Sequence, residues 1–262
     1  MSMLKYSGSV PEHYDREIGP VLFTPYAKYF VRTLATLTLP PVPRVLELAC
    51  GTGRLTSELV AHFSPEVNVL ATDLSEPMMS VARSRVTGNV EWRQADIQTL
   101  PLEDGGFDLV VAQFGLMLVP DRNRAFQEVQ RVLAPGGRLV FSVWSKSSVV
   151  HHTGVDTVLP FLEGISPEGL ESMRAAPFTL ADTEKTVDLL QSHGFSDVSY
   201  ETASVTIEDI DAWSQGFVFG TGIGGNIQEH RREAAVLALK SAYSSLQPVV
   251  SEAIIYKARK NM

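Results

Sequence analysis

Cysteine is almost absent from the sequence, since Cys50 is the only one in 262 residues. A single thiol cannot close an intramolecular disulfide, and no Cys or His residues are spaced as metal ligands. We therefore expect no metal site and a protein that works in a reducing compartment. Cys50 lies within a tight turn, so we assign it no nucleophilic role.

Long apolar runs are also missing. No segment approaches the ~18 apolar residues that a membrane helix needs. Residues 1–19 have no uninterrupted apolar core of the kind found in signal peptides. The sequence therefore predicts a cytoplasmic protein without a membrane partner.

The chain has no excess of basic charge. Its formal net charge is −8 at pH 7, and the basic clusters at 231–232 and 257–260 are short, so we expect no nucleic-acid partner. Hydrophobic residues make up 44% and charged residues 20% of the chain, which is typical of globular proteins. The length suits one α/β domain with some additional structure.

Between residues 44 and 144 the sequence alternates short β-branched runs with helical patterns. This alternation predicts βαβ units and a parallel sheet. The expected strands are 44–49, 67–73, 90–96, 107–113 and 137–144. The expected helices are 55–63, 76–85 and 122–133. Ser75 and Asp121 are the expected N-caps of the last two, and the turn at 134–137 is expected to end the third helix.

Beyond Trp144 the pattern is less regular. We expect a helix over 183–195 that ends at Gly194, a strand over 196–207 and a final strand over 252–259. Two consecutive strands without a short crossover predict an antiparallel edge. Near the N-terminus, residues 21–37 have the periodicity of an amphipathic helix.

The most informative stretch is "RVLELACGTGRLT", in which an expected strand runs into a Gly-Thr-Gly turn. A phosphate-binding P-loop would continue with Gly-Lys and Ser or Thr, and nothing after Gly51 matches. A dinucleotide fingerprint needs a third small residue at the position where Thr56 stands. The turn therefore disfavours phosphate and NAD, and leaves open an adenosine-like ligand without phosphates.

Two acids strengthen the signal of this turn. Asp73 ends the second expected strand, twenty residues after Gly53, where a carboxylate can accept hydrogen bonds from ribose hydroxyls. Glu47 lies just before the turn, where it would repel a pyrophosphate but attract a cationic ligand. The structural alternative for Asp73 is a helix-capping acid.

Three segments carry a resemblance to a known family. "VLELACGTGRLT", "VLATDLSEPMMSVAR" and "WRQADIQTLPLEDGGFDLVVAQFGLMLVPDRNRAFQEVQRVLAPGGRLVFSVW" together resemble the class I S-adenosylmethionine-dependent methyltransferases, in particular the ubiquinone/menaquinone-biosynthesis branch. The likeness covers about residues 10–207. It implies one α/β domain over 1–262, a Rossmann-like three-layer sandwich with helical lid insertions. Its seven-stranded sheet would have the order 3-2-1-4-5-7-6, with the last strand antiparallel.

The resemblance also implies S-adenosyl-L-methionine as cofactor, together with the residues that hold it. Glu47 would head the turn, and the backbone at Ala49, Gly51 and Gly53 would give access to the methionine part of the cofactor. Asp73 would bind both ribose hydroxyls.

Around the adenine, the resemblance implies packing by Leu74 and Met78. The Asp96 carboxylate would accept a hydrogen bond from the N6 amine, and the Ile97 amide would reach a ring nitrogen. The structural alternatives are a solvated loop carboxylate for Asp96 and a core methionine for Met78.

The resemblance places three further residues near the methionine part. The Gln113 carbonyl and the Phe114 side chain would approach the amine and the sulfonium, and Tyr14 matches a residue that covers the cofactor in relatives. The alternatives are a core residue for Phe114 and a surface aromatic for Tyr14.

Methyl transfer from a sulfonium is an in-line displacement. The protein must align the acceptor, exclude water and, for a protonated acceptor, remove a proton. A catalytic side chain is optional in this chemistry. His151 and His152 follow the fifth expected strand and are candidates for a general base, although we favour their interpretation as solvated loop histidines.

The acceptor pocket is expected from the less regular parts of the chain. Residues 1–40 would form N-terminal lid helices, and the insertions 145–181 and 208–247 would complete the pocket. The glycine-rich stretch 216–225 predicts a mobile or closely packed loop. Aromatic residues that could line the pocket or face the cationic sulfonium are Tyr26, Phe161, Trp213, Phe217 and Phe219.

The sequence thus predicts methyl transfer from S-adenosylmethionine to a small-molecule acceptor. One alternative is an enzyme that consumes the cofactor without methyl transfer, by intramolecular cyclisation or a lyase-type reaction releasing methylthioadenosine. Another is a non-catalytic binding module. The sequence fixes neither the acceptor nor the oligomeric state, and a homodimer stays open.

Overall fold

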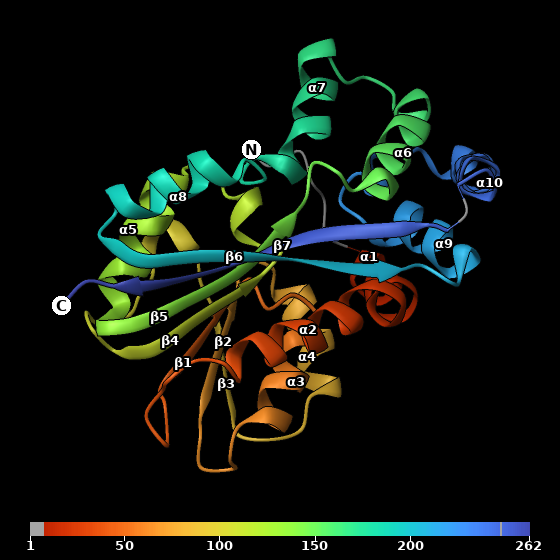
Figure 1. The fold of residues 1–262 in the computed structure, drawn as a ribbon. Helices are drawn as coiled ribbons and strands as arrows, with labels where there is room; N and C mark the ends of the chain where they lie inside the picture. Colours follow the sequence, from red (N-terminus) through yellow and green to blue (C-terminus); the bar gives the residue numbers. More distant parts are fainter. Residues whose placement is uncertain (1–7, 247) are drawn as a thin grey trace.

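The computed structural model describes residues 8–246 and 248–262. Its centre is a seven-stranded sheet with the order β3-β2-β1-β4-β5-β7-β6, which confirms the predicted Rossmann-like topology (Figure 1). The first five strands are parallel. The strands are β1 (Val45–Leu48), β2 (Val69–Asp73), β3 (Val90–Gln94), β4 (Phe107–Gln113), β5 (Leu133–Trp144), β6 (Phe195–Thr206) and β7 (Val250–Lys260).

The last strand runs against its neighbours, as predicted. β7 pairs antiparallel with both β5 and β6, so it lies inside the sheet and β6 forms the edge. The predicted antiparallel edge is therefore the pair β6–β7.

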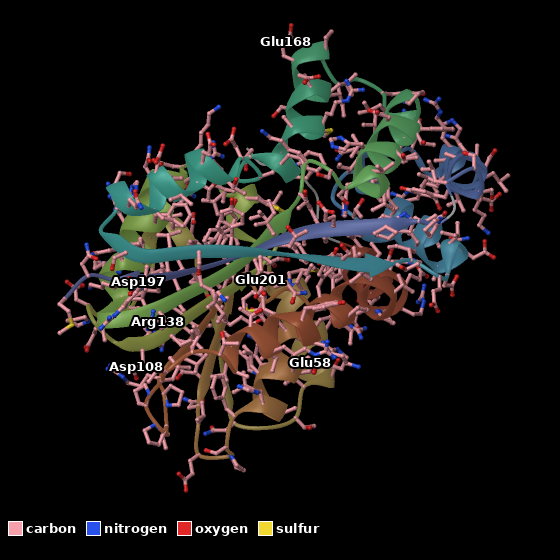
Figure 2. The ribbon with its side chains drawn as sticks, in the orientation of Figure 1. Glu58, Asp108, Arg138, Glu168, Asp197 and Glu201 are labelled. Atoms are coloured by element: carbon pink, nitrogen blue, oxygen red, sulfur yellow. The ribbon has the colours of Figure 1, made fainter. Side chains whose placement is uncertain are left out.

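Helices cover both faces of the sheet, with α2, α3 and α4 on one face and α5 and α8 on the other (Figure 1). Leu46, Val110 and Phe141 in the central strands are fully buried, as expected for strands covered on both faces. Figure 2 shows charged side chains such as Glu58 and Glu168 on the outside. The helices of this part are α1 (Val10–His13), α2 (Thr24–Leu34), α3 (Arg54–His62), α4 (Glu76–Arg85), α5 (Arg122–Val132) and α8 (Thr183–Ser192).

The structure confirms the predicted N-caps of α4 and α5. The Ser75 hydroxyl accepts from the amide of Met78 at 3.4 Å, and the Asp121 carboxylate accepts from the amide of Arg124 at 3.0 Å. Each bond satisfies an amide that has no partner within its helix.

The predicted helix over 21–37 is two elements. A wider-wound π-type helix, η1 (Tyr14–Phe23), leads directly into α2, which ends at Leu34. Pro20 lies within η1. Proline has no N–H to donate and interrupts regular α-helical hydrogen bonding, so the chain cannot form one continuous α-helix here.

The turn predicted at 134–137 is a bulge within β5. Helix α5 ends at Val132 and β5 already begins at Leu133. The pairing with β4 jumps from Phe107↔Leu133 to Leu109↔Arg138, so the intervening residues bulge out of the sheet. Gly136, with φ +75°, supplies the left-handed conformation that the bulge requires.

Four further helices gather beyond one end of the sheet (Figure 1). Sequence periodicity did not predict α6 and α7, because Gly154 lies within α6 and Pro167 and Gly169 lie within α7. A Cβ at Gly154 would lie 2.7 Å from the Tyr243 hydroxyl and 2.8 Å from the Phe217 ring, so close packing requires glycine there. These helices are α6 (Val149–Val158), α7 (Pro167–Ala175), α9 (Ile210–Gly220) and α10 (Glu229–Ser244). The short 3₁₀ helices are η2 (Ile97–Thr99), η3 (Leu116–Leu118), η4 (Leu159–Phe161), η5 (Ala176–Phe178) and η6 (Gly224–Asn226).

Within residues 8–246 and 248–262, no helix has the length and apolar character required to cross a membrane. The same residues contain no group of three or more His, Cys, Asp or Glu side chains arranged to hold a metal ion.

Candidate functional site

The Gly-Thr-Gly turn joins β1 to α3 and has an unusual backbone. Ala49, Gly51 and Gly53 all have positive φ, at 52°, 55° and 75°, a region that residues with a side chain rarely occupy. A Cβ at Gly53 would lie 2.9 Å from the Val86 side chain. The sequence therefore needs glycine at this position for both conformation and space.

Asp73 connects this turn to the next one. One carboxylate oxygen accepts from the amide of Gly51 at 2.8 Å, and the other accepts from the amide of Ser75 at 2.7 Å. Burial raises the pKa of Asp73, and these amide bonds oppose the shift. Ser75, rather than Asp73, caps α4. Each carboxylate oxygen has a further lone pair for a ligand hydroxyl.

Glu47 and Gln113 present unpaired oxygens beside the turn. Glu47 is 1% exposed, and burial raises the pKa of its carboxyl group to about 8. Its Oε2 and the Oε1 of Gln113 are buried without a hydrogen-bond partner, while Gln113 Nε2 donates to the Phe23 carbonyl at 3.0 Å. Two unsatisfied acceptors in one place favour a cationic or hydrogen-bond-donating ligand.

These groups surround a small cavity of about 300 Å³. Its wall combines the turn, the end of β1, the end of β4 and the N-terminal segment. The residues that line it are Tyr14, Phe23, Glu47, Ala49, Cys50, Gly51, Thr52, Arg54, Leu55 and Gln113.

The residues expected around the adenine lie past the ends of β2 and β3. The amide of Ala95 donates to the Asp73 carbonyl at 3.0 Å, so Asp96 follows close to Asp73. The Asp96 carboxylate accepts from the amide of Gln98 at 2.8 Å, and Ile97 is buried.

Leu74 and Met78, the two residues expected to pack on the adenine, differ in exposure. Leu74 is 64% exposed, while Met78 is buried. The Met78 methyl group lies 3.7 Å from the position that a Cβ at Gly51 would take. Met78 thus packs against the turn, and Leu74 offers an uncovered apolar side chain.

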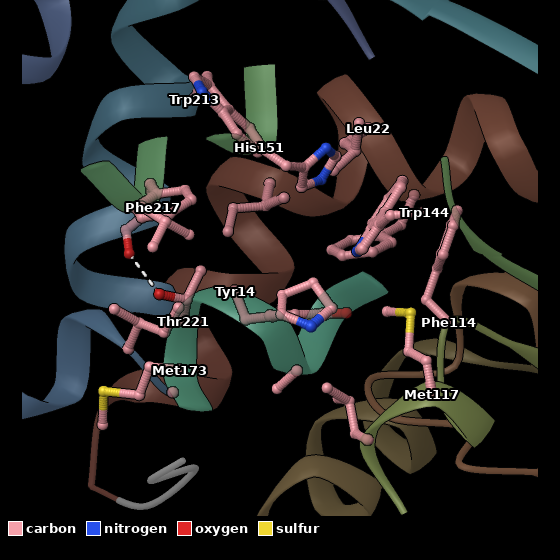
Figure 3. A pocket seen from close by; sticks show the side chains of 18 residues that line it. Tyr14, Leu22, Phe114, Met117, Trp144, His151, Met173, Trp213, Phe217 and Thr221 are labelled. Carbon is pink, nitrogen blue, oxygen red and sulfur yellow. Dashed lines mark hydrogen bonds between the residues drawn. The ribbon is translucent and has the colours of Figure 1, made fainter. Parts of the chain in front are cut away.

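A second, larger cavity of about 780 Å³ adjoins the first (Figure 3). Tyr14 and Phe23 line both cavities. All three segments expected to form the acceptor pocket contribute to it; their residues 1–7 and 247 lie outside the described residues. The lining residues are Tyr14, Ile18, Leu22, Phe23, Phe114, Met117, Leu118, Trp144, His151, Val155, Met173, Ala176, Pro177, Trp213, Phe217, Thr221, Gly222 and Ile223.

The expected aromatic lining is partly wrong. Trp213 and Phe217 line the larger cavity. Tyr26 is buried and donates to the Ser251 hydroxyl at 3.0 Å. The other two rings lie beneath arginine side chains, Phe161 under Arg231 and Phe219 under Arg232, where the guanidinium group favours an aromatic face.

The favoured interpretation of the two histidines as solvated loop residues is wrong, because both lie in α6. His151 is buried and lines the larger cavity, and burial lowers its pKa to about 3. His152 is half-buried, stacks on Phe178 and binds the Lys146 carbonyl through Nε2 at 3.0 Å. Of these two histidines, His151 is therefore the one that lines the cavity.

The N-terminal segment is tied to the glycine turn by charge. Arg54, the first residue of α3, donates through Nε to the Asp15 carboxylate at 2.8 Å. Arg85 lies 3.4 Å from the same carboxylate. The sequence does not predict this ion pair, because Asp15 and Arg54 are far apart along the chain.

Comparison with known proteins agrees with this geometry. A family model described as a methyltransferase domain matches residues 45–137. The ubiquinone/menaquinone biosynthesis C-methyltransferase UbiE of Francisella philomiragia is 30% identical over 206 residues, which are 74% of this chain and 82% of that protein. The demethylmenaquinone methyltransferase of Lactococcus lactis is 27% identical over 205 residues, or 74% of this chain and 81% of that protein.

A solved structure shares the fold. Phosphoethanolamine N-methyltransferase 2 of Haemonchus contortus, in complex with S-adenosylmethionine, aligns with a TM-score of 0.67 and 18% identity. The alignment covers 98% of this chain and 58% of that one.

The residues around the smaller cavity fit S-adenosylmethionine. The unpaired Glu47 and Gln113 oxygens suit the ammonium group of its amino-acid end, and the glycines of the turn, with positive φ, allow the backbone to approach a ligand closely. The activity of the family is methyl transfer from this cofactor to a small-molecule acceptor. The sequence relatives, the fold and the site agree, and the chain belongs to the class I S-adenosylmethionine-dependent methyltransferases, in the ubiquinone/menaquinone-biosynthesis branch.

Proposed function

We propose that this methyltransferase acts on a planar, largely apolar aromatic molecule bound in the larger cavity. The observation that carries this proposal is the lining of that cavity. Tyr14, Phe23, Phe114, Trp144 and Trp213 all contribute rings to it. Aromatic side chains recognise flat ligands by stacking and by excluding water.

The cofactor is proposed to lie across the smaller cavity. Asp73 would bind the ribose hydroxyls, and Asp96, Ile97, Leu74 and Met78 would surround the adenine. The bound cofactor supplies the activated methyl group. The amino-acid end would meet the Glu47 carboxylate, which attracts a cation when ionised.

The remaining cofactor contacts are assigned to the region between the two cavities. The backbone at Ala49, Gly51 and Gly53 would hold the amino-acid end, together with the Gln113 carbonyl. Phe114 and Tyr14 would cover the sulfonium. Tyr14 lines both cavities, which supports its placement between donor and acceptor.

Three segments are proposed to form the lid over the acceptor: residues 1–40, 145–181 and 208–247. Support comes from Gly220, where a Cβ would lie 2.6 Å from the backbone nitrogen of Tyr14. The N-terminal segment and α9 are thus closely packed. Together these segments would exclude water and align the acceptor with the methyl group.

The ring chemistry of the relatives selects the acceptors to test first. One relative is named as a C-methyltransferase of ubiquinone and menaquinone biosynthesis, and the other as a demethylmenaquinone methyltransferase. The net charge of −8 further favours a small molecule over a nucleic acid. We therefore propose hydroquinone-type aromatic rings as the first acceptor class.

A direct assay tests this function. The protein is incubated with S-adenosylmethionine and a panel of naphthohydroquinones, benzohydroquinones and aliphatic amines. We expect S-adenosylhomocysteine and a methylated product with aromatic acceptors only. Methylation of amines alone would overturn the aromatic assignment, and release of methylthioadenosine with the cofactor alone would show a different reaction.

A further inference from the structure

Most residues that line the larger cavity are apolar, and His151 is one of the few polar side chains among them. Figure 3 shows its ring at the cavity wall beside Trp144 and Leu22. The ring centroids of His151 and Trp144 are 3.9 Å apart, with planes 31° from parallel. Trp213 meets the same imidazole edge-on at 5.9 Å. The imidazole is therefore held by aromatic rings on two sides.

Ser148 fixes the orientation of this imidazole. Its hydroxyl lies 2.8 Å from His151 Nδ1, and Ser148 itself is fully buried. Ser148 occupies the N-cap position of α6, yet its side chain caps no helix amide. Serine at this position ordinarily bonds the helix backbone, so here its hydroxyl serves the histidine instead.

The same hydroxyl determines which ring nitrogen carries the proton. The amide of Glu252 donates to Ser148 Oγ at 3.1 Å, so that oxygen acts as an acceptor toward the backbone. Its own hydrogen has one acceptor within the described part of the chain, His151 Nδ1. The opposite arrangement would leave a buried hydroxyl hydrogen unpaired, which is unfavourable. Nδ1 is thus the acceptor, and Nε2 carries the hydrogen.

Thr221, another polar side chain at the wall, is already engaged. Its hydroxyl donates to the Phe217 carbonyl at 2.6 Å and accepts from the amide of Gly224 at 3.0 Å. His151 Nε2 has no protein partner among the residues described. The Nε1 of Trp213, which also lines this cavity, is a second donor without a partner, but that atom is buried. A donor at the wall of an apolar cavity selects for a ligand that brings an acceptor.

We propose that His151 is a positioning residue that donates a hydrogen bond from Nε2 to a carbonyl or phenolate oxygen of the acceptor, rather than acting as a general base. This inference rests on the proposed function, in which the cavity receives an aromatic ring. Burial lowers the pKa of His151, so the imidazole is neutral at physiological pH. The bond would fix the rotation of the flat ring, which stacking alone leaves free.

Three ligands with one bicyclic skeleton test the proposal by binding: indane, 1-indanone and 4-indanol. Quenching of tryptophan fluorescence at saturating S-adenosylhomocysteine reports their affinity. Because a ketone can only accept hydrogen bonds, we expect wild type to bind 1-indanone about fivefold more tightly than indane. If 4-indanol binds while 1-indanone does not, Nε2 is an acceptor and the proposal is wrong. If none of the three binds, the cavity does not receive such rings and the proposal also fails.

Variants assign the preference to the proposed network. His151→Phe keeps a ring against Trp144 and should abolish or reverse the ketone preference. His151→Gln, which can still donate a hydrogen bond, should retain part of the ketone preference. Ser148→Ala should weaken the preference, because the Ser148 hydroxyl would no longer hold the hydrogen of His151 on Nε2. A ketone preference unchanged in His151→Phe would overturn the proposal. Affinity for S-adenosylhomocysteine, expected to change less than twofold, verifies that each variant is folded.

The binding test separates this inference from the proposed function. A ketone preference that depends on His151, in a protein that methylates no aromatic acceptor, would support the inference and refute the function. For an acceptor that is methylated, His151→Phe should raise KM more than it lowers kcat. An unchanged kcat/KM would contradict the positioning role.

Discussion

Phe114 and Trp144 lie face to face, with ring centroids 3.5 Å apart and planes 15° from parallel. Phe114 follows the last residue of β4, and Trp144 is the last residue of β5, the neighbouring strand. Gln113, next to Phe114, lines the smaller cavity, and His151 stacks beyond Trp144 in the larger one. The stack therefore lies along the wall between the smaller cavity and the larger one.

Replacing Trp144 should affect the acceptor much more than the cofactor. Trp144 is 5% exposed, so Trp144→Leu should lower the free energy of unfolding by about 2–4 kcal/mol. Acceptor affinity should fall at least tenfold, because the ring that faces the cavity is lost. Chemical denaturation and ligand titration measure the two effects.

The exposed Tyr200 on β6 provides the matched control. Tyr200→Leu should leave acceptor affinity unchanged. A loss of S-adenosylhomocysteine affinity in Trp144→Leu as large as the loss for the acceptor would contradict the separation of the two cavities.

Glu47 should couple cofactor binding to proton release. Burial raises its pKa from the ordinary value of 4.5 to about 8, so the free protein holds a proton there at pH 7. A cationic ligand favours the ionised carboxylate and should release up to about one proton. Calorimetric titration in buffers of different ionisation enthalpy measures this number. Glu47→Gln should remove the release, and equal release in both proteins would exclude Glu47 as its source.

The same raised pKa affects stability without cofactor. The folded state retains the proton between pH 4.5 and about 8, while the unfolded chain loses it. The Glu47 contribution to stability is therefore present below this window and is lost as pH rises through it. Denaturation of wild type and Glu47→Gln across the window should show a steeper decline for wild type.

Asp73→Ala should weaken cofactor binding at least tenfold. The substitution removes the carboxylate proposed to bind two ribose hydroxyls, and also the acceptor for the Gly51 and Ser75 amides. Asp73→Asn, which keeps one acceptor oxygen, should lose less affinity. Calorimetry with S-adenosylhomocysteine provides the measurement, and unchanged affinity in the alanine variant would refute the placement of the ribose.

The turn and the acids around the smaller cavity could be predicted from the sequence because their signals are local. A strand, a Gly-Thr-Gly turn and Asp73 at the end of the next strand follow from periodicity and spacing alone. Once the strands are parallel, their carboxyl ends meet at one edge. The positive φ of Gly51 and Gly53 and the burial of Glu47 agree with that expectation.

The lining of the larger cavity could not be predicted in the same way. The sequence predicts that Trp144 ends a buried strand. Its position at the cavity depends on packing against Phe114 and His151. His151 reads as a loop residue because Gly154 interrupts the helical pattern of α6. Phe161 and Phe219 are aromatic but are covered by arginines from α10. Contacts between distant segments decide each of these positions, and periodicity carries no information about them.

The ion pair between Asp15 and Arg54 should hold the N-terminal segment over the glycine turn. Asp15 is 17% and Arg54 16% exposed, so the pair is partly shielded from water. Asp15→Asn would leave Arg54 and Arg85 without this carboxylate. We expect the free energy of unfolding to fall by about 1–2 kcal/mol, less than for a fully buried pair.

The affinity for S-adenosylhomocysteine should also fall severalfold in Asp15→Asn, because Arg54 lines the smaller cavity and loses its fixed position. Asp104→Asn is the control: Asp104 also pairs with an arginine, Arg131, but is 80% exposed. That variant should change neither stability nor affinity measurably. If Asp15→Asn loses stability but binds S-adenosylhomocysteine as wild type does, the ion pair supports the fold alone and has no part in forming the cofactor site.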